Sequence, residues 1–126
     1  MLDRNALVKQ RLIDAVLAEN LPDTVNELTL GEVGLSSEQL IDLFETQCMS
    51  RHLDLQSRVM QRQGQSFYTI GSAGHEGNAA MALAFRPTDM AFLHYRSGAF
   101  VLQRSKQVPG QTPIFDMLLS FAASSD

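Results

Sequence analysis

The segment LSSEQL around Ser36 places the strongest constraint on how this chain folds. Ser36 suits the N-cap of a helix and Gln39 follows three residues later, which is the pattern of a capping box. Leucines stand at both positions of a hydrophobic staple around this start. We therefore expect a long helix from here to Gln63, with Gly64 as its left-handed C-terminal residue.

The predicted long helix carries an apolar stripe whose members recur at steps of three, four or seven residues. The stripe consists of Ile41, Phe44, Cys48, Leu55 and Val59, and His52 falls on it as well. We expect Cys48 on this stripe to be a core residue. Three arginines also lie on the helix, where we favour a solvated face over ion pairs with the acidic arm or with a partner subunit.

Residues 1–35 predict a helix followed by an extended acidic arm. Val8, Leu12 and Val16 are four residues apart, which is typical of a short amphipathic helix over residues 4–18. Pro22 and two glycines interrupt the segment that follows. We expect the arm to lie on a surface rather than to form a domain of its own.

Downstream of the long helix, two short β-prone runs alternate with helical segments. The runs are SFYTIG, residues 66–71, and MAFLHY, residues 90–95. A last helix is expected with Thr112 as N-cap and Pro113 at its first position. This order predicts an α/β layered fold. Two strands are too few for a sheet, so we expect residues outside this chain, or another chain, to complete it.

Charge is unevenly distributed along the sequence, which has a net charge of -4. Seven acids and no Lys or Arg occur from Glu19 to Ser50, whereas seven basic residues and three acids occur from Arg51 to Lys106. The basic second part indicates an anionic ligand or partner, with an ordinary mixed surface as the equal alternative. The acidic total argues against nucleic-acid binding.

The single cysteine excludes an internal disulfide and fits a reducing compartment. No signal peptide is visible at the N-terminus. No apolar run approaches the roughly 20 residues that a membrane span needs. These features predict a soluble cytoplasmic protein.

Tyr95 and Arg96 stand where the second predicted strand gives way to a helix. Ligands of open α/β sheets bind at the carboxyl ends of strands, and a helix N-terminus there offers unpaired amide groups. A guanidinium adds two-pronged, permanently charged donors for phosphate oxygens. The alternative, which we favour from placement alone, is an arginine in a structural salt bridge and a tyrosine packed in the core.

The glycine-rich segment GSAGHEGN, residues 71–78, is neither a Walker loop nor a dinucleotide fingerprint, because the required residues and spacing are absent. His75 within it could be an acid/base or hydrogen-bonding group, with a helix-capping histidine as the more ordinary alternative. The three histidines, His52, His75 and His94, lack the spacing of metal ligands. With only one cysteine, a structural zinc site is not expected.

Several features follow one another between residues 51 and 100: Arg and Leu-Asp on the long helix, Arg-Gln-Gly at its end, Phe-Tyr, a Gly-x-Glu-Gly turn, an alanine-rich helix and Tyr-Arg. Together they resemble the alpha subunit of the first, thiamine-diphosphate-dependent component of 2-oxoacid dehydrogenase complexes, of the pyruvate and branched-chain class. The resemblance covers about residues 36–122. It implies that residues 36–126 are an incomplete N-terminal portion of the thiamine-diphosphate-binding domain, mostly helical with few short parallel strands.

In that family the Tyr-Arg pair contacts the diphosphate of the cofactor, so the resemblance implies that Tyr95 and Arg96 bind thiamine diphosphate. The Gly-x-Glu-Gly turn lies near the active-site cleft, which makes Ser72, His75 and His94 candidate neighbours of substrate or cofactor. The family's Gly-Asp-Gly…Asn segment, which holds Mg²⁺, would lie downstream of residue 126. We therefore expect no catalytic residue and no metal ligand within the chain.

The function implied is a part in the oxidative decarboxylation of a 2-oxoacid, with acyl transfer to a lipoyl carrier. The implied partners are a beta subunit or beta-like half, in an alpha-two beta-two assembly, and a lipoyl-bearing acyltransferase; neither nucleic acid nor a membrane is among them. We expect the chain alone to be inactive, to bind little or no thiamine diphosphate and to associate. The alternative is a non-catalytic helical module that binds a partner through the long helix and the acidic arm.

Overall fold

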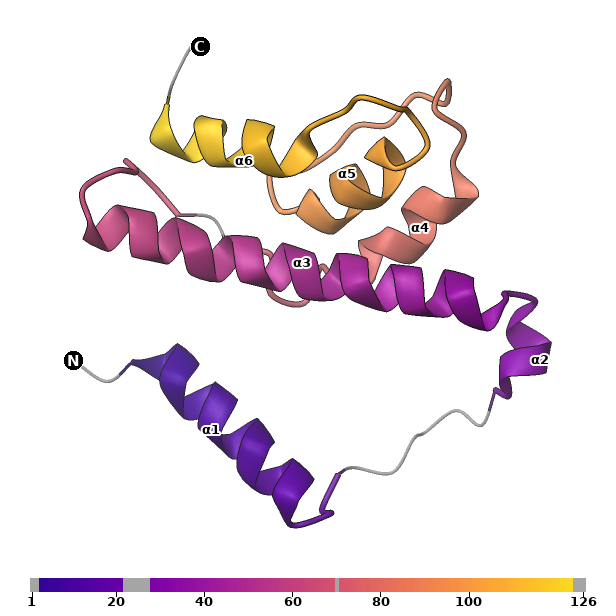
Figure 1. Ribbon diagram of the computed structural model, residues 1–126, viewed down its shortest axis with the longest axis horizontal. Coiled ribbons are helices and arrows are strands. Elements are labelled where there is room, and N and C mark those ends of the chain that lie inside the picture. The colour runs from indigo at the N-terminus through magenta and orange to yellow at the C-terminus, as the bar shows by residue number, and fades with distance from the viewer. Residues whose placement is uncertain (1–2, 22–27, 70, 124–126) are drawn as a thin grey trace. The chain divides into compact units, whose positions relative to one another are not determined.

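The computed structural model describes residues 3–21, 28–69 and 71–123. These residues form helices α1 to α6, and none of them forms a strand (Figure 1). The chain divides into two compact units, Met1–Gly34 and Leu35–Asp126. Within the described ranges, no helix is both long enough and apolar enough to cross a membrane.

The first unit contains α1, Arg4–Leu17, and the single-turn helix α2, Leu30–Val33. The expected N-terminal helix is therefore present, and its apolar residues Val8 and Leu12 are exposed. The backbone amide of Thr29 donates to the Glu32 carboxylate at 2.8 Å, which lowers the pKa of Glu32 and closes the start of α2. Part of the predicted acidic arm, residues 22–27, lies outside the described residues.

The second unit is organised by α3, Ser37–Arg62, and the predicted capping box is confirmed. The Ser36 hydroxyl accepts a hydrogen bond from the Gln39 amide at 3.2 Å, and the Ser36 amide donates to the Gln39 side chain at 2.9 Å. At the other end Gly64 has a φ of 72°, as expected for the residue that ends a helix in the left-handed conformation. Local signals at both ends therefore set the length of α3.

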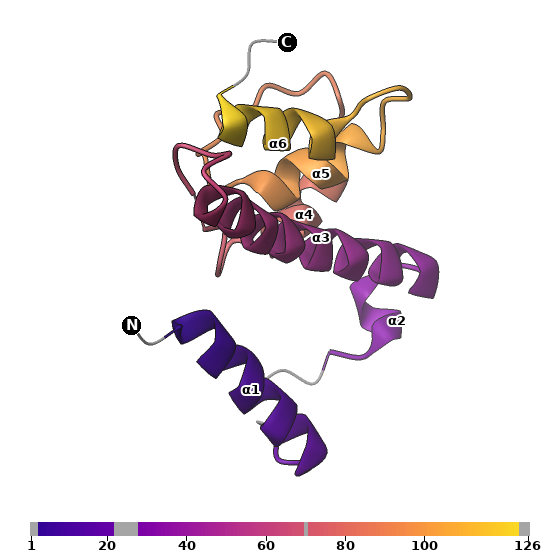
Figure 2. The same cartoon turned by 60° about the vertical axis from the view of Figure 1, so that its left-hand side comes forward.

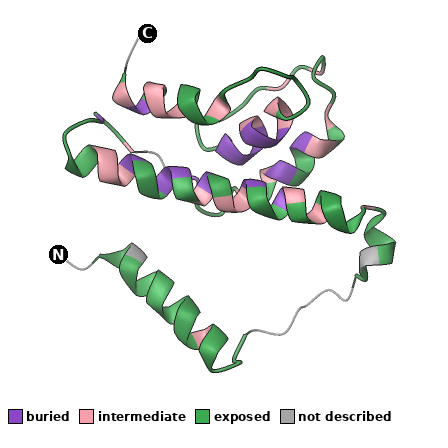
Figure 3. Ribbon diagram, viewed as in Figure 1, coloured by how far each residue is buried: buried purple, intermediate pink, exposed green. Residues whose placement is uncertain are grey.

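The face that α3 buries is not the predicted apolar stripe. Its buried residues are Leu43, Thr46, Ser50, Leu53, Asp54 and Ser57. Ile41, Phe44 and Leu55 of the stripe are exposed, and Cys48, expected in the core, is only half-buried. Figure 3 shows buried and exposed stretches alternating along α3. Small side chains on the buried face allow the neighbouring helices to approach closely, so packing space rather than hydrophobicity selects this face.

Three shorter helices contact α3: α4, Asn78–Ala84; α5, Gly98–Ser105; and α6, Pro113–Ala122. Figures 1 and 2 show all three on the same side of α3. Fully buried alanines, Ala79 and Ala82 of α4 and Ala99 of α5, supply much of the core. The predicted start of the last helix is confirmed, with Thr112 as N-cap and proline in the first turn.

The predicted strands are wrong for the described residues, because residues 66–69 and 90–95 form loops; residue 70 lies outside the described part. Neither segment has a neighbouring strand to satisfy its backbone, so β-propensity alone does not produce a ladder. Contacts with helices hold the first loop and the segment that precedes the second. Arg104 of α5 donates to the carbonyls of Arg86, Pro87 and Asp89, and the Ser66 hydroxyl donates to the Phe121 carbonyl.

Candidate anion-binding site

His94, Tyr95 and Arg96 form a stacked cluster on the loop that leads into α5. The rings of His94 and Tyr95 lie 3.7 Å apart between centroids, and the Arg96 guanidinium lies 5.4 Å from the centre of the Tyr95 ring. The guanidinium also donates a long, 3.4 Å hydrogen bond to the Tyr95 hydroxyl. Stacking against the tyrosine restricts Arg96 while leaving most of its donors free.

Among the described residues, Tyr95 is not packed in the core and Arg96 is not in a structural salt bridge, so the alternative reading of this pair does not hold. Tyr95 is 61% exposed, so it is not packed in the core. Arg96 is also exposed, and no carboxylate in the described ranges pairs with it. By contrast, Arg51 and Arg86 each hold an aspartate at 2.8 Å. The arginine at this position is therefore available to an anion from outside.

The cluster stands at the N-terminus of α5, where Ser97 is the N-cap but its side chain makes no capping hydrogen bond. The first amide groups of a helix, here those of Gly98, Ala99 and Phe100, have no acceptor within the helix. The positive end of the helix dipole adds to the charge of Arg96. An oxyanion at this point would meet both a guanidinium and helix amides.

Buried polar groups on α3 fix where α5 begins. A Cβ atom added at Gly98 would lie 3.6 Å from the Ser50 hydroxyl and 2.9 Å from the Met117 methyl group, so the helix start packs closely against both. The Ser50 hydroxyl in turn lies 3.0 Å from that of Ser72. The start of α5 and the glycine-rich turn therefore share one contact on α3.

Asp54 is the centre of this buried network. Its carboxylate accepts hydrogen bonds from the Ser72 amide at 2.8 Å and the Ser72 hydroxyl at 3.1 Å, and it pairs with Arg51 at 2.8 Å. Arg51 also reaches Glu76 at 3.4 Å, and Glu76 accepts from the Gly74 amide at 2.7 Å. The glycine-rich turn is thus attached to α3 through charged groups at both of its ends.

The structure separates the predicted cleft residues. Ser72 is buried, and its side chain and its amide make hydrogen bonds to α3, so it positions the turn rather than facing solvent. His75 is exposed, and among the described residues its ring has no contact with Tyr95 or Arg96. His94 is the one of the three that joins the Tyr95–Arg96 cluster.

Tyr95 also borders a groove of about 360 Å³ between α5 and α6. Its walls include Tyr68, Val101 and Phe121, with Asp116 and Ser120 among the polar lining groups. The Tyr68 hydroxyl lies 3.1 Å from that of Ser120, which holds one wall in place. A ligand that extends from the cluster along this groove would therefore meet a mainly apolar surface with few polar groups.

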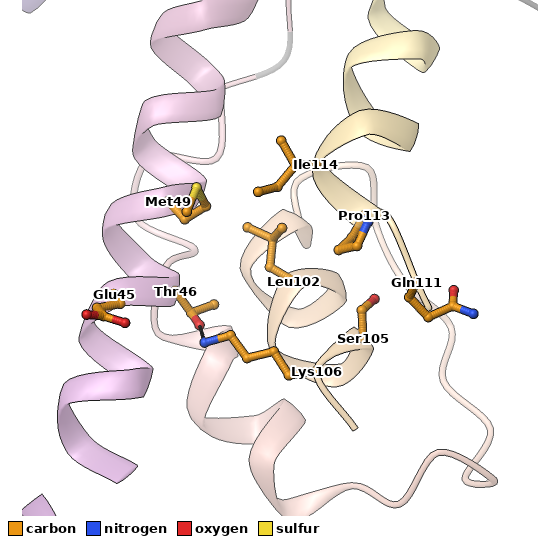
Figure 4. Close-up of a pocket in the computed structure, with 9 residues that line it drawn as sticks. All are labelled: Glu45, Thr46, Met49, Leu102, Ser105, Lys106, Gln111, Pro113 and Ile114. Carbon is orange, nitrogen blue, oxygen red and sulfur yellow. Dashed lines mark hydrogen bonds between the residues drawn. The ribbon is translucent and has the colours of Figure 1, made fainter. Parts of the chain in front are cut away.

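A second hollow, of about 270 Å³, lies between α3, α5 and α6 and is lined by Met49, Leu102 and Ile114 (Figure 4). Lys106 at its edge donates to the Asp42 carboxylate at 2.5 Å and to the Thr46 hydroxyl at 2.7 Å. Hydrogen bonds from Gln103 and Lys106 hold the pKa of Asp42 below its ordinary value. Because its ammonium is already bound, Lys106 is a clamp between helices rather than an anion site.

Sequence reasoning noted Asp54 only as part of a motif and missed its role in positioning the turn. A signal was present, because Thr46, Ser50, Asp54 and Ser57 recur at steps of four, four and three on one helix face. A periodic stripe of small polar residues indicates a buried, hydrogen-bonded face as readily as an apolar one does when space is limited. The prediction from sequence considered hydrophobicity alone, and it therefore chose the opposite face of α3 as the buried one.

No metal-binding group of three or more His, Cys, Asp or Glu side chains occurs within the described part of the chain. Comparisons with protein-family models, curated proteins and solved structures found no match to this chain.

Proposed function

We propose that this chain supplies the diphosphate-binding side of a thiamine diphosphate site in a 2-oxoacid dehydrogenase. The observation that carries the proposal is the Arg96 guanidinium, which is exposed, lies over the Tyr95 ring and has no carboxylate partner among the described residues. It precedes the N-terminus of α5, where the Ser97 side chain makes no capping hydrogen bond. A diphosphate is the ligand whose charge and oxygen geometry suit this donor set. The ordered sequence features described above select thiamine diphosphate among diphosphates.

Arg96 and Tyr95 have separate parts in the proposed binding. Arg96 donates two hydrogen bonds to phosphate oxygens and neutralises their charge. Tyr95 holds the guanidinium in place and offers its hydroxyl, while the first amides of α5 bind further oxygens. The Asp54–Ser72–Ser50 network keeps the start of α5 fixed. Thiamine diphosphate, when bound, supplies the carbanion chemistry that decarboxylates a 2-oxoacid.

The remaining parts of such an enzyme are proposed to come from elsewhere. The Mg²⁺ ligands would lie outside the described residues, and a beta subunit or beta-like half would complete the active site. A lipoyl-bearing acyltransferase would receive the acyl group, and the enzyme would be cytoplasmic. The chain alone is therefore expected to hold a diphosphate weakly and to show no turnover.

A second candidate function, a helical interaction module, is favoured by one observation. Ile41, Phe44 and Leu55 of the apolar stripe of α3 are exposed, and the helix buries its opposite face. Binding of a partner through this stripe needs no cofactor, so the two functions are separable by experiment.

Amide-resolved NMR of the full chain during titration with thiamine diphosphate, and separately with thiamine, tests the proposed site. We expect shifts at the amides of Gly98, Ala99 and Phe100 with thiamine diphosphate and not with thiamine, at ligand concentrations of about 1–10 mM. Equal responses to both ligands, or no shift at the start of α5, would contradict the assignment. Tight magnesium-dependent binding by this chain would contradict the claim that it holds only one side of the site.

A further inference from the structure

The exposed His94 ring has a defined place in the cluster beside the proposed diphosphate site. Its centroid lies 3.7 Å from that of the Tyr95 ring, with 37° between the two planes. The backbone amide of Arg96 donates a long, 3.4 Å hydrogen bond to His94 Nδ1, and the Ser97 amide donates to the His94 carbonyl at 2.9 Å. The ring is therefore attached to the turn from which Arg96 and α5 start.

The hydrogen bond to Nδ1 defines the protonation state of the His94 ring. An imidazole nitrogen accepts a hydrogen bond only when it carries no proton, so the ring is neutral and its proton is on Nε2. Protonation places an N–H group on both nitrogens, and Nδ1 can then no longer accept. Two changes follow together: the ring gains a positive charge, and the Arg96 amide is released as a donor.

Both changes favour an oxyanion at this point. A second positive charge beside the Arg96 guanidinium increases the attraction for a diphosphate, and the released amide is a further backbone donor next to the start of α5. Without an anion, an imidazolium and a guanidinium in one cluster repel each other. A bound diphosphate neutralises both charges, so it stabilises the protonated His94 ring.

Other charged groups lie on the segments around His94. Asp116 of α6 lines the groove that the cluster borders, Arg104 of α5 donates to loop carbonyls, and Asp89, earlier on the same loop, pairs with Arg86. None of them bonds to the His94 ring, and neither does any charged side chain of α3, α4 or the glycine-rich turn, over residues 28–69 and 71–123. Because histidine is the side chain whose charge ordinarily changes between about pH 5 and 8, a change of pH in this range acts on the cluster through His94.

We propose that diphosphate binding at the start of α5 is coupled to protonation of His94. As the anion binds, Nδ1 takes up a proton from solvent, so the site holds a diphosphate more tightly at mildly acidic than at mildly alkaline pH. The inference rests on the proposed function, because it concerns the same site, and it adds regulation: a fall in pH favours the loaded site and a rise favours release.

Titration of the full chain with inorganic pyrophosphate tests the coupling, at about pH 5.5 and about pH 7.5 and at constant ionic strength. The Gly98 amide signal gives the dissociation constants of wild type and His94→Gln. Pyrophosphate itself changes charge over this range, but it does so equally for both chains, as does any loss of ring stacking. The wild type should gain about fivefold in affinity over His94→Gln on going from the higher to the lower pH.

Two further variants check that the charge of this one ring is responsible. His75→Gln is the matched control, because His75 is exposed and, among the described residues, its ring does not contact the cluster, so it should keep the wild-type pH dependence. His94→Lys carries its charge at both pH values and should bind pyrophosphate about fivefold more tightly than His94→Gln at about pH 7.5. A His75→Gln chain that loses the pH dependence, or a His94→Lys chain that binds no better than His94→Gln, would overturn the proposal.

Linkage is reciprocal, so the ligand must also act on the ring. Pyrophosphate should raise the pH at which the His94 ring titrates, read from its Cε1 proton signal, and should leave the His75 ring unchanged. Equal movement of both rings would show a general salt effect and would overturn the coupling.

The same titrations separate this proposal from the proposed function. Binding at Gly98 with the same pH dependence in wild type and His94→Gln would overturn the coupling and leave the diphosphate site standing. No response of Gly98 at either pH would overturn both. Because His75 and His94 are exposed, every variant should retain the helical circular dichroism of the wild type.

Discussion

Thr46, Ser50 and Ser57 are the largest side chains that are almost completely inaccessible to solvent in the described structure. Each hydroxyl has a partner: Thr46 and Ser57 donate to helix carbonyls at 3.0 and 2.8 Å, and Ser50 contacts Ser72. No buried side-chain polar atom in the described ranges lacks a hydrogen bond. Small hydroxyl residues therefore let other helices pack closely against this face of α3, and each buried hydroxyl still has a hydrogen-bond partner.

Asp54 is the buried group whose loss should cost most. Asp54→Ala leaves the Ser72 amide without its acceptor and removes the partner of Arg51. We expect a loss of about 3 kcal/mol in the free energy of unfolding, measured by urea denaturation with unchanged slope.

The matched control for Asp54→Ala is Gln61→Ala, at an exposed position near the end of the same helix. This change should alter stability by less than about 0.5 kcal/mol, because surface substitutions rarely do more. A cost for Asp54→Ala as small as that of the control would contradict the claim that the turn is attached to α3 through this carboxylate.

The start of helix α3 depends on one side chain, that of Ser36. Ser36→Ala removes the acceptor for the Gln39 amide and should destabilise the chain by about 1 kcal/mol in thermal or urea unfolding. Ser37→Ala, one residue further on at the first helical position, should change stability by less than about half as much. Equal effects of the two changes would argue against the capping box.

The clamp between α3 and α5 should make stability depend on pH. Hydrogen bonds from Gln103 and Lys106 lower the pKa of Asp42 in the folded chain. A lowered pKa favours the folded state above the ordinary aspartate value of 3.8, and this contribution is lost as the pH falls below that value through the folded pKa.

The variant Asp42→Asn measures this contribution directly. It should be less stable than wild type by about 1 kcal/mol at pH 7, because the pair with Lys106 is half-exposed, and the difference should shrink as the pH falls below 3.8. Lys106→Gln should weaken the same pH dependence. Urea unfolding at several pH values provides the measurement, and a stability difference that does not change with pH would contradict this account of the clamp.

At the scale of the whole chain, the sequence allowed prediction of features whose cause is local. The ends of α3 and the start of α6 depend on residues within one turn, and both were predictable. The buried face of α3 was not, because it depends on Ala79, Ala82 and Ala99, which approach from other helices. Residues 90–95 have strand-forming residues but no neighbouring strand among the described residues, so they form a loop, and Arg104 holds the segment just before it.

The candidate site likewise has features that could be predicted from the sequence and features that could not. The order of Tyr95, Arg96 and a following helix was readable from the sequence, and so was the chemistry that a guanidinium offers to phosphate. The stacking of His94, Tyr95 and Arg96, and the support that Asp54 gives through Ser72, required the structure. The contacts of Asp54 and Ser50 with Ser72 join residues 18 and 22 positions apart, and contacts at such a separation carry no local sequence signal.

The central claim is that Arg96 binds a diphosphate at the start of α5, and one titration tests it most directly. The dissociation constant for thiamine diphosphate, followed by the NMR shift of the Gly98 amide, should rise at least about tenfold in Arg96→Ala, a loss of about 1.4 kcal/mol or more. Arg11→Ala, which removes an exposed guanidinium from α1, should leave the constant unchanged. If Arg96→Ala and Arg11→Ala bind thiamine diphosphate as the wild type does, Arg96 does not bind the diphosphate and the proposed function is wrong.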